Sequence, residues 1–130
     1  MDTLTVVLAD DNPDVLSDLR EALREFDIVS TADNGEGALS AVNFHAPDVL
    51  VVDISLPDMN GLKVAARLRE AHSRTKIIFL TVHEDPEYIS AGFAAGASGY
   101  VFKGRLASDL AHAIRDVIAG GTFLSPALRK

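Results

Sequence analysis

The residues with the clearest chemical potential stand at the ends of short apolar runs. The runs at 4–9, 49–54, 76–81 and 99–102 carry, at or just after their ends, Asp10 and Asp11, Asp53, Thr81, and Lys103. Phosphoryl transfer onto a carboxylate needs a carboxylate nucleophile, and cationic and hydroxyl groups that hold the phosphoryl oxygens. The residue types at these four points match that chemistry.

Each of these residues also has an ordinary interpretation. An aspartate after a strand is often a turn residue or a helix cap. A threonine in an apolar run is usually a strand residue, and a single lysine is usually a solvated surface group. Their joint occurrence at the ends of four separate runs is what favours a functional site.

The elements that must position these residues alternate regularly along the chain. A fifth apolar run lies at 27–32, and helical stretches at 13–25, 35–44, 62–71, 86–95 and 107–119 separate the runs, with Asp85 as the expected cap before Pro86. Strict strand–helix alternation predicts an α/β fold, a flavodoxin-like doubly wound (βα)5 sandwich. We expect a five-stranded parallel sheet in the order 2-1-3-4-5.

That strand order brings the chemical groups to one edge of the sheet. The ends of the first, third, fourth and fifth strands become neighbours, so Asp10, Asp11 and Asp53 are expected within a few ångströms of one another. Three close carboxylates repel one another unless a cation lies between them. Oxygen ligands suit Mg²⁺, which we therefore expect as the cofactor.

Composition bounds the remaining classes of protein. The 130 residues include no cysteine and carry a net charge of −7, without a Lys/Arg cluster, so a direct nucleic-acid interface is not expected. No signal peptide or membrane-spanning run is visible, and we expect a cytoplasmic protein without a membrane contact. The pair Gly120-Gly121 suggests a domain at 1–120 followed by a tail at 121–130, with Ser125-Pro126 at the start of a further helix.

The full set of motifs resembles the receiver domain of a two-component response regulator, over about residues 4–120. The residues that carry the resemblance are Asp10-Asp11, Asp53, Leu56-Pro57 with Gly61, Thr81, and the run from Gly99 to Lys103. The resemblance implies that Asp53 accepts a phosphoryl group from a sensor histidine kinase. It also implies that Asp11, Asp53 and the backbone carbonyl of Ser55 bind Mg²⁺, with Asp10 acting through water.

The resemblance further implies a conformational switch. Thr81 and Lys103 would hold the phosphoryl oxygens, and Tyr100 would turn inward as Thr81 moves toward the phosphoryl group. Ser55 and His83 occupy positions that tune dephosphorylation in this family. Many receivers have proline after the lysine in a cis peptide; Gly104 stands here, so we expect a trans bond or a looser loop.

The tail is similar to the end of a receiver in the LuxR-type, nitrate-regulator-like class of transcription factors. That class implies a DNA-binding helix-turn-helix domain, which the sequence lacks, and a homodimer formed on phosphorylation. The expected chemistry is confined to phosphorylation and dephosphorylation of the chain itself, so it is not an enzyme for another substrate. Gly92 inside the helix at 86–95 suggests a mobile element near the switch residues.

Other readings remain. A stand-alone receiver acting on a partner protein would share every motif. A phosphatase of the haloacid-dehalogenase type also uses an aspartyl nucleophile, but needs a second Asp where Ser55 stands. An FMN site would meet repulsion from Asp10 and Asp11, and a P-loop motif is absent.

Overall fold

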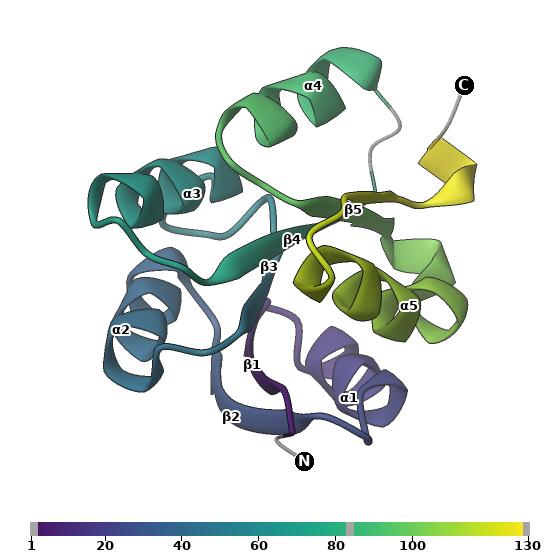
Figure 1. Cartoon of the computed structure of the whole chain (residues 1–130), viewed down its shortest axis with the longest axis horizontal. Helices are drawn as coiled ribbons and strands as arrows, with labels where there is room; N and C mark the ends of the chain where they lie inside the picture. The colour runs from purple at the N-terminus through teal and green to yellow at the C-terminus, as the bar shows by residue number, and fades with distance from the viewer. Residues whose placement is uncertain (1–2, 83–84, 129–130) are drawn as a thin grey trace.

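A parallel sheet forms the centre of the molecule, with helices on both of its faces (Figure 1). The structure is a computed structural model, and it describes residues 3–82 and 85–128. The strand order is β2-β1-β3-β4-β5-β6, and every pairing is parallel. The strands are β1 (Thr5–Ala9), β2 (Asp27–Ala32), β3 (Val49–Asp53), β4 (Lys76–Thr81), β5 (Gly99–Phe102) and β6 (Phe123–Leu124).

The helices divide between the two faces, as expected for a doubly wound fold. Alternate residues of the strands point to opposite faces, so the core has two halves. No helix in the described part of the chain is long and apolar enough to cross a membrane. One face is covered by α1 (Pro13–Ala22) and α5 (Leu106–Ile118), and the other by α2 (Gly35–His45), α3 (Gly61–Glu70) and α4 (Pro86–Ala94).

Side-chain caps set where four of the helices begin. Asn12, Asn34, Asn60 and Asp85 each accept a hydrogen bond from a backbone N–H in the first turn of α1, α2, α3 and α4. The predicted cap at Asp85 is thereby confirmed. Helix α1 ends at Ala22, three residues before the predicted limit, because the chain turns there through a hydrogen bond from Phe26 N to the Leu23 carbonyl.

The prediction of a five-stranded sheet is wrong in its count, since the sheet has a sixth strand. Strand β6 lies in the predicted tail and pairs with β5 through Gly99↔Phe123 and Tyr100↔Leu124. Two residues are too few to show an alternating pattern, so only the pairing itself defines the strand. Where a further helix was expected, the chain forms a short 3-10 turn at Pro126–Leu128.

Candidate functional site

Three carboxylates meet at the carboxyl end of the sheet, as the strand order predicted. Asp10 follows β1 and is 0% exposed, Asp53 ends β3 and is 6% exposed, and Asp11 is exposed beside them. One ligand oxygen from each lies within 4.8 Å of the other two. The fold therefore brings Asp53, at the end of β3, to the same edge as Asp10 and Asp11, which precede it by 42 or more residues in the sequence.

A backbone amide fixes each of the two buried carboxylates in the same way. Asn12 N donates to Asp10 Oδ1 at 2.9 Å, and Ser55 N donates to Asp53 Oδ1 at 2.9 Å. In both cases the donor lies two residues after the aspartate, so the turn after each strand orients the carboxyl group. The second oxygen of each carboxylate is left facing the centre of the cluster.

Lys103 contacts both of these second oxygens. Its Nζ lies 2.9 Å from Asp10 Oδ2 and 3.0 Å from Asp53 Oδ2. Burial by itself would lower the pKa of Lys103, but hydrogen bonds and charge attraction from Asp10 and Asp53 outweigh it and raise the pKa above its ordinary value. The ammonium is therefore charged at neutral pH and draws the two carboxylates together.

The residues of the cluster fit a divalent cation. Three carboxylates against one ammonium leave two negative charges, which is the charge that such a cation balances. Asp10 Oδ2 is buried and has an ion pair with Lys103 but no hydrogen bond of regular geometry among the described residues. An all-oxygen donor set with a buried acceptor suits a hard cation.

Thr81 and Tyr100 lie on β4 and β5, the two strands that follow β3 in the sheet. Thr81 ends β4 and is buried, and it pairs in register with Phe102, the residue before Lys103. Tyr100 is fully buried, so its ring occupies the inward position, and its hydroxyl donates to the Tyr88 carbonyl at 3.0 Å. Burial raises the pKa of Tyr100 well above its usual value, so the phenol is protonated.

Ser55 is the remaining predicted site residue within the described part of the chain. Ser55 is exposed at the mouth of the cluster, and its bridge partner Asn60 closes the loop after β3. His83 lies outside the described residues. The described peptide bonds are all trans, so the Lys103–Gly104 bond agrees with the expectation from its missing proline.

The loop after β3 contains contacts that the sequence did not reveal. Asp58 accepts hydrogen bonds from Gly35 N at 2.6 Å and Glu36 N at 3.0 Å, which fastens the loop to the start of α2. These bonds lower the pKa of Asp58, and the bond from Gly35 has the largest effect. Asn60 Nδ2 donates to Tyr88 on α4 at 3.1 Å. Asp and Asn in a turn indicate a local role, so no sequence signal pointed to these distant partners.

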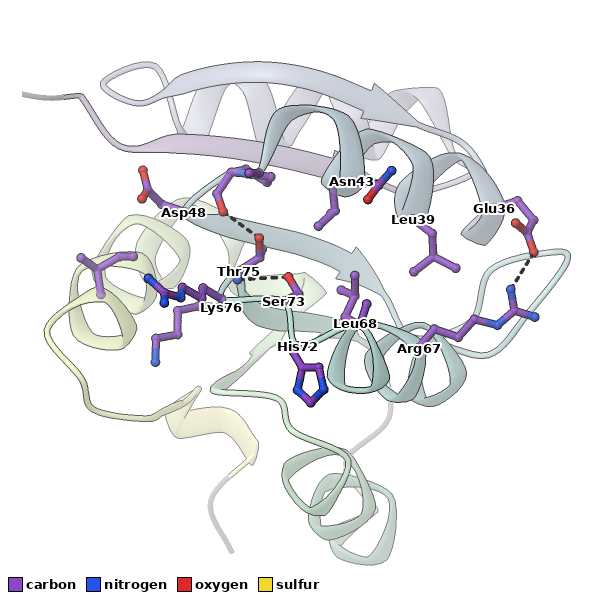
Figure 2. A pocket seen from close by; sticks show the side chains of 16 residues that line it. Glu36, Leu39, Asn43, Asp48, Arg67, Leu68, His72, Ser73, Thr75 and Lys76 are labelled. Atoms are coloured by element: carbon purple, nitrogen blue, oxygen red, sulfur yellow. Dashed lines mark hydrogen bonds and ion pairs between the residues drawn. The ribbon is translucent and has the colours of Figure 1, made fainter.

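A hollow on the surface of the molecule is separate from the carboxylate cluster. It has a volume of about 730 Å³ and lies between α2 and α3, near the amino ends of β3 and β4 (Figure 2). An ion pair between Glu36 and Arg67 spans it at one end, as Figure 2 shows. None of the residues that line it belongs to the cluster, so the chemistry is assigned to the opposite edge of the sheet.

The fold and the cluster define a receiver, and comparison with known proteins places the chain in that class. The family model of the response regulator receiver domain matches residues 6–115, and the chain belongs to this family. It is 34% identical over 127 residues to the oxygen regulatory protein NreC of Staphylococcus carnosus, which covers 95% of this chain and 58% of NreC. It is 33% identical over 102 residues to the transcriptional regulatory protein DegU of Brevibacillus brevis, covering 78% and 43%.

Solved structures agree with the assignment. The receiver domain of the putative response regulator NarL from Mycobacterium tuberculosis superposes with a TM-score of 0.89 at 28% identity, covering 92% of this chain and 99% of that one. A LuxR-family regulator from Aurantimonas gives 0.92 at 28% identity, covering 98% and 93%. The chain spans about half the length of the relatives NreC and DegU. The recognised resemblance, a receiver similar to those of LuxR-type regulators, is confirmed.

Proposed function

We propose that the chain is a phosphorylation-activated switch in which Asp53 accepts a phosphoryl group from a sensor histidine kinase. The observation that carries the proposal is the position of Asp53. Its carboxylate lies at the open end of the sheet, oriented by Ser55 N, 3.0 Å from the Lys103 ammonium, and within the three-carboxylate cluster. A carboxylate held beside a fixed positive charge is suited to attack an electrophilic phosphorus.

In the proposed transfer, one Asp53 oxygen forms a bond to phosphorus as the phosphorus–nitrogen bond of the kinase phosphohistidine breaks. The electron pair of that bond stays on the imidazole nitrogen. Lys103 stabilises the negative charge on the phosphoryl oxygens, and the Thr81 hydroxyl holds one of them. Mg²⁺, bound by Asp10, Asp11, Asp53 and the Ser55 carbonyl, would supply further positive charge at those oxygens.

The reaction ends on the chain itself, so the protein is proposed to have no separate substrate beyond the phosphodonor. Water hydrolyses the acyl phosphate and returns the carboxylate. Ser55 and His83 are proposed to tune this step, since both follow residues of the site by two positions, and Ser55 is exposed at its mouth.

The proposed output is transcription control in the cytoplasm. NreC and DegU carry the names of regulatory proteins and are longer than this chain, which supports a DNA-binding domain elsewhere in the complete protein. A solved RcsB structure, similar in fold, contains dimers bound to DNA, and by analogy we propose a homodimer for this chain, formed on phosphorylation. In this proposal the receiver itself contacts the kinase and not DNA, in accord with its net charge of −7.

Mass spectrometry after incubation with Mg²⁺ and acetyl phosphate tests the central step. The wild type is expected to gain one phosphoryl group, and Asp53→Asn is expected to gain none. Asp48→Asn is the matched control, because Asp48 is an exposed aspartate directly before the first residue of β3, at the end of the strand away from the cluster. Absence of an adduct on the wild type with both acetyl phosphate and a histidine kinase would refute the proposal.

A further inference from the structure

A buried set of hydrogen bonds outside the carboxylate cluster joins the C-terminal tail to β5. Ser125 is 0% exposed, and its backbone N–H donates to the Tyr100 carbonyl at 3.0 Å. Its hydroxyl accepts a hydrogen bond from Phe102 N at 3.0 Å and donates one to Asp109 Oδ2 at 2.7 Å. The hydroxyl therefore uses both its donor and an acceptor site in a buried position.

Asp109 is a buried carboxylate that serves this contact. It lies in the first turn of α5 and is 7% exposed. Its other oxygen, Oδ1, accepts a hydrogen bond from the exposed Ser108 hydroxyl at 3.0 Å. A hydrogen bond to a charged acceptor is stronger than one between neutral groups, so Asp109 fixes the direction of the Ser125 hydroxyl.

The tail is packed on both sides of this serine. Phe123 lies in the half of the core that α1 and α5 cover, whereas Leu124 and Leu128 lie in the half covered by α2, α3 and α4. Leu128 N donates to the Ser125 carbonyl at 2.8 Å, which turns the chain back toward the core. The position of Ser125 is thus set by packing as well as by its own hydrogen bonds.

The hydrogen bond from Phe102 N to the Ser125 hydroxyl connects the tail to the residue next to Lys103. Phe102 directly precedes Lys103, whose ammonium bridges Asp10 and Asp53. On its other side, Lys103 begins a short 3-10 turn, Lys103–Arg105, that leads into α5. The Ser125 hydroxyl therefore constrains the backbone directly before the lysine.

We propose that Ser125, oriented by Asp109, is a positioning residue for Lys103, and that it links the C-terminal tail to the phosphorylation site. This inference rests on the proposed function, because it assigns Lys103 to the phosphoryl oxygens. Linkage is reciprocal. A phosphoryl group that holds Lys103 in place therefore strengthens the docking of the tail. Release of the tail also frees the backbone beside Lys103, and for that separate reason we expect it to slow phosphorylation.

The test compares Ser125→Ala with Ser108→Ala. Both changes remove a hydroxyl that contacts Asp109, but only Ser125 also contacts Phe102 N. Ser125→Ala is expected to speed hydrogen exchange at the Phe102 amide by about tenfold, the effect of one lost hydrogen bond, and to slow phosphorylation by acetyl phosphate severalfold. Ser108→Ala is expected to match the wild type in both measurements.

Asp109→Asn is a milder second variant, for the case that Ser125→Ala does not fold. An amide oxygen still accepts the hydrogen bond from Ser125, but without the charge, so an intermediate effect on both measurements is expected. Equal exchange and equal phosphorylation in Ser125→Ala and Ser108→Ala would overturn the inference. Faster exchange with an unchanged phosphorylation rate would also overturn it, because the serine would then serve stability alone.

Failure of the proposed function gives a different pattern. A wild type that takes no phosphoryl group refutes the role of Asp53 and, with it, the catalytic part of this inference. The link between Ser125 and the Lys103 backbone is still decided by the Phe102 exchange rate, measured in the chain without phosphodonor.

Discussion

Gly92 of α4 lies directly against the ring of Tyr100. A Cβ atom built on Gly92 would stand 2.0 Å from the Tyr100 hydroxyl oxygen and 2.5 Å from two ring carbons. No real Cβ tolerates such distances, so the absence of a side chain at Gly92 is what admits the tyrosine to its inward position. The glycine that suggested a weak helix has a packing role between α4 and β5.

Gly92→Ala is accordingly expected to destabilise the protein. Helix propensity alone would make this change stabilising by about 1 kcal/mol, whereas overpacking a buried site costs about 1–3 kcal/mol. We expect the clash to dominate and to move the Tyr100 ring, with a lower melting temperature and altered tyrosine ring signals in NMR spectra. Ser90→Ala, at an exposed position of α4, is the control for propensity; a more stable Gly92→Ala protein with unchanged ring signals would contradict the packing role.

Helix α4 is expected to change its hydrogen exchange on phosphorylation. The backbone carbonyl of Tyr88, in this helix, accepts a hydrogen bond from the Tyr100 hydroxyl. The hydroxyl of Tyr88 accepts another from Asn60, in the loop after β3. A change at either the loop or Tyr100 therefore reaches this helix. Exchange measured with and without acetyl phosphate, in wild type and Asp53→Asn, tests the idea; identical protection of residues 86–94 in both states would count against a mobile α4.

Mg²⁺ is expected to raise the melting temperature of the wild type. The three carboxylates repel one another, and a cation that binds only the folded state stabilises it by ~1.4 kcal/mol at a tenfold excess over its dissociation constant, or roughly 4–6 °C. Asp11→Ala should reduce this rise, while Glu70→Ala, which removes one exposed carboxylate of α3, should not. An equal Mg²⁺ effect in all three proteins would rule out the cluster as the binding site.

Asp58 is expected to contribute to stability in a pH-dependent way. Its pKa lies below the ordinary 3.8, because the amides of Gly35 and Glu36 favour the charged carboxylate. Such a contribution is present above pH 3.8 and is lost as the pH falls through the lower pKa of the folded state. Asp58→Asn should therefore melt below the wild type at neutral pH, and the difference should shrink in acid.

Thermal melts of wild type and Asp58→Asn between about pH 7 and about pH 3 measure this difference. Asp27→Asn, which removes one exposed carboxylate at the start of β2, controls for the change in net charge. A gap between Asp58→Asn and wild type that stays constant over the whole range would show that the carboxylate charge is not what holds α2 to the loop.

The strands and helices whose apolar residues recur at regular spacing were predictable from the sequence. The apolar runs and amphipathic stretches predicted five strands and five helices with small errors at their ends, and the strand order placed Asp10, Asp11, Asp53 and Lys103 together. The lysine that follows β5 could be assigned because parallel strands bring their carboxyl ends to one edge of the sheet.

What the sequence did not predict are contacts between side chains and distant backbone groups. Ser125 and Asp58 are small polar residues in turn-like segments, and the backbone N–H groups that donate to their side chains lie 22 or more residues away along the chain. Only the folded arrangement identifies such partners. Strand β6 was missed for the same reason, since its two residues become a strand by pairing with β5.

Strand β6 has a consequence for how the molecule meets its surroundings. An uncovered terminal strand offers free N–H and C=O groups to other chains and promotes aggregation. Here the pairing of β5 with Phe123 and Leu124 places only a two-residue strand at that margin. A protein cut before Phe123 would uncover Tyr100 and its neighbours on β5, so its solubility, and not only its signalling, should suffer.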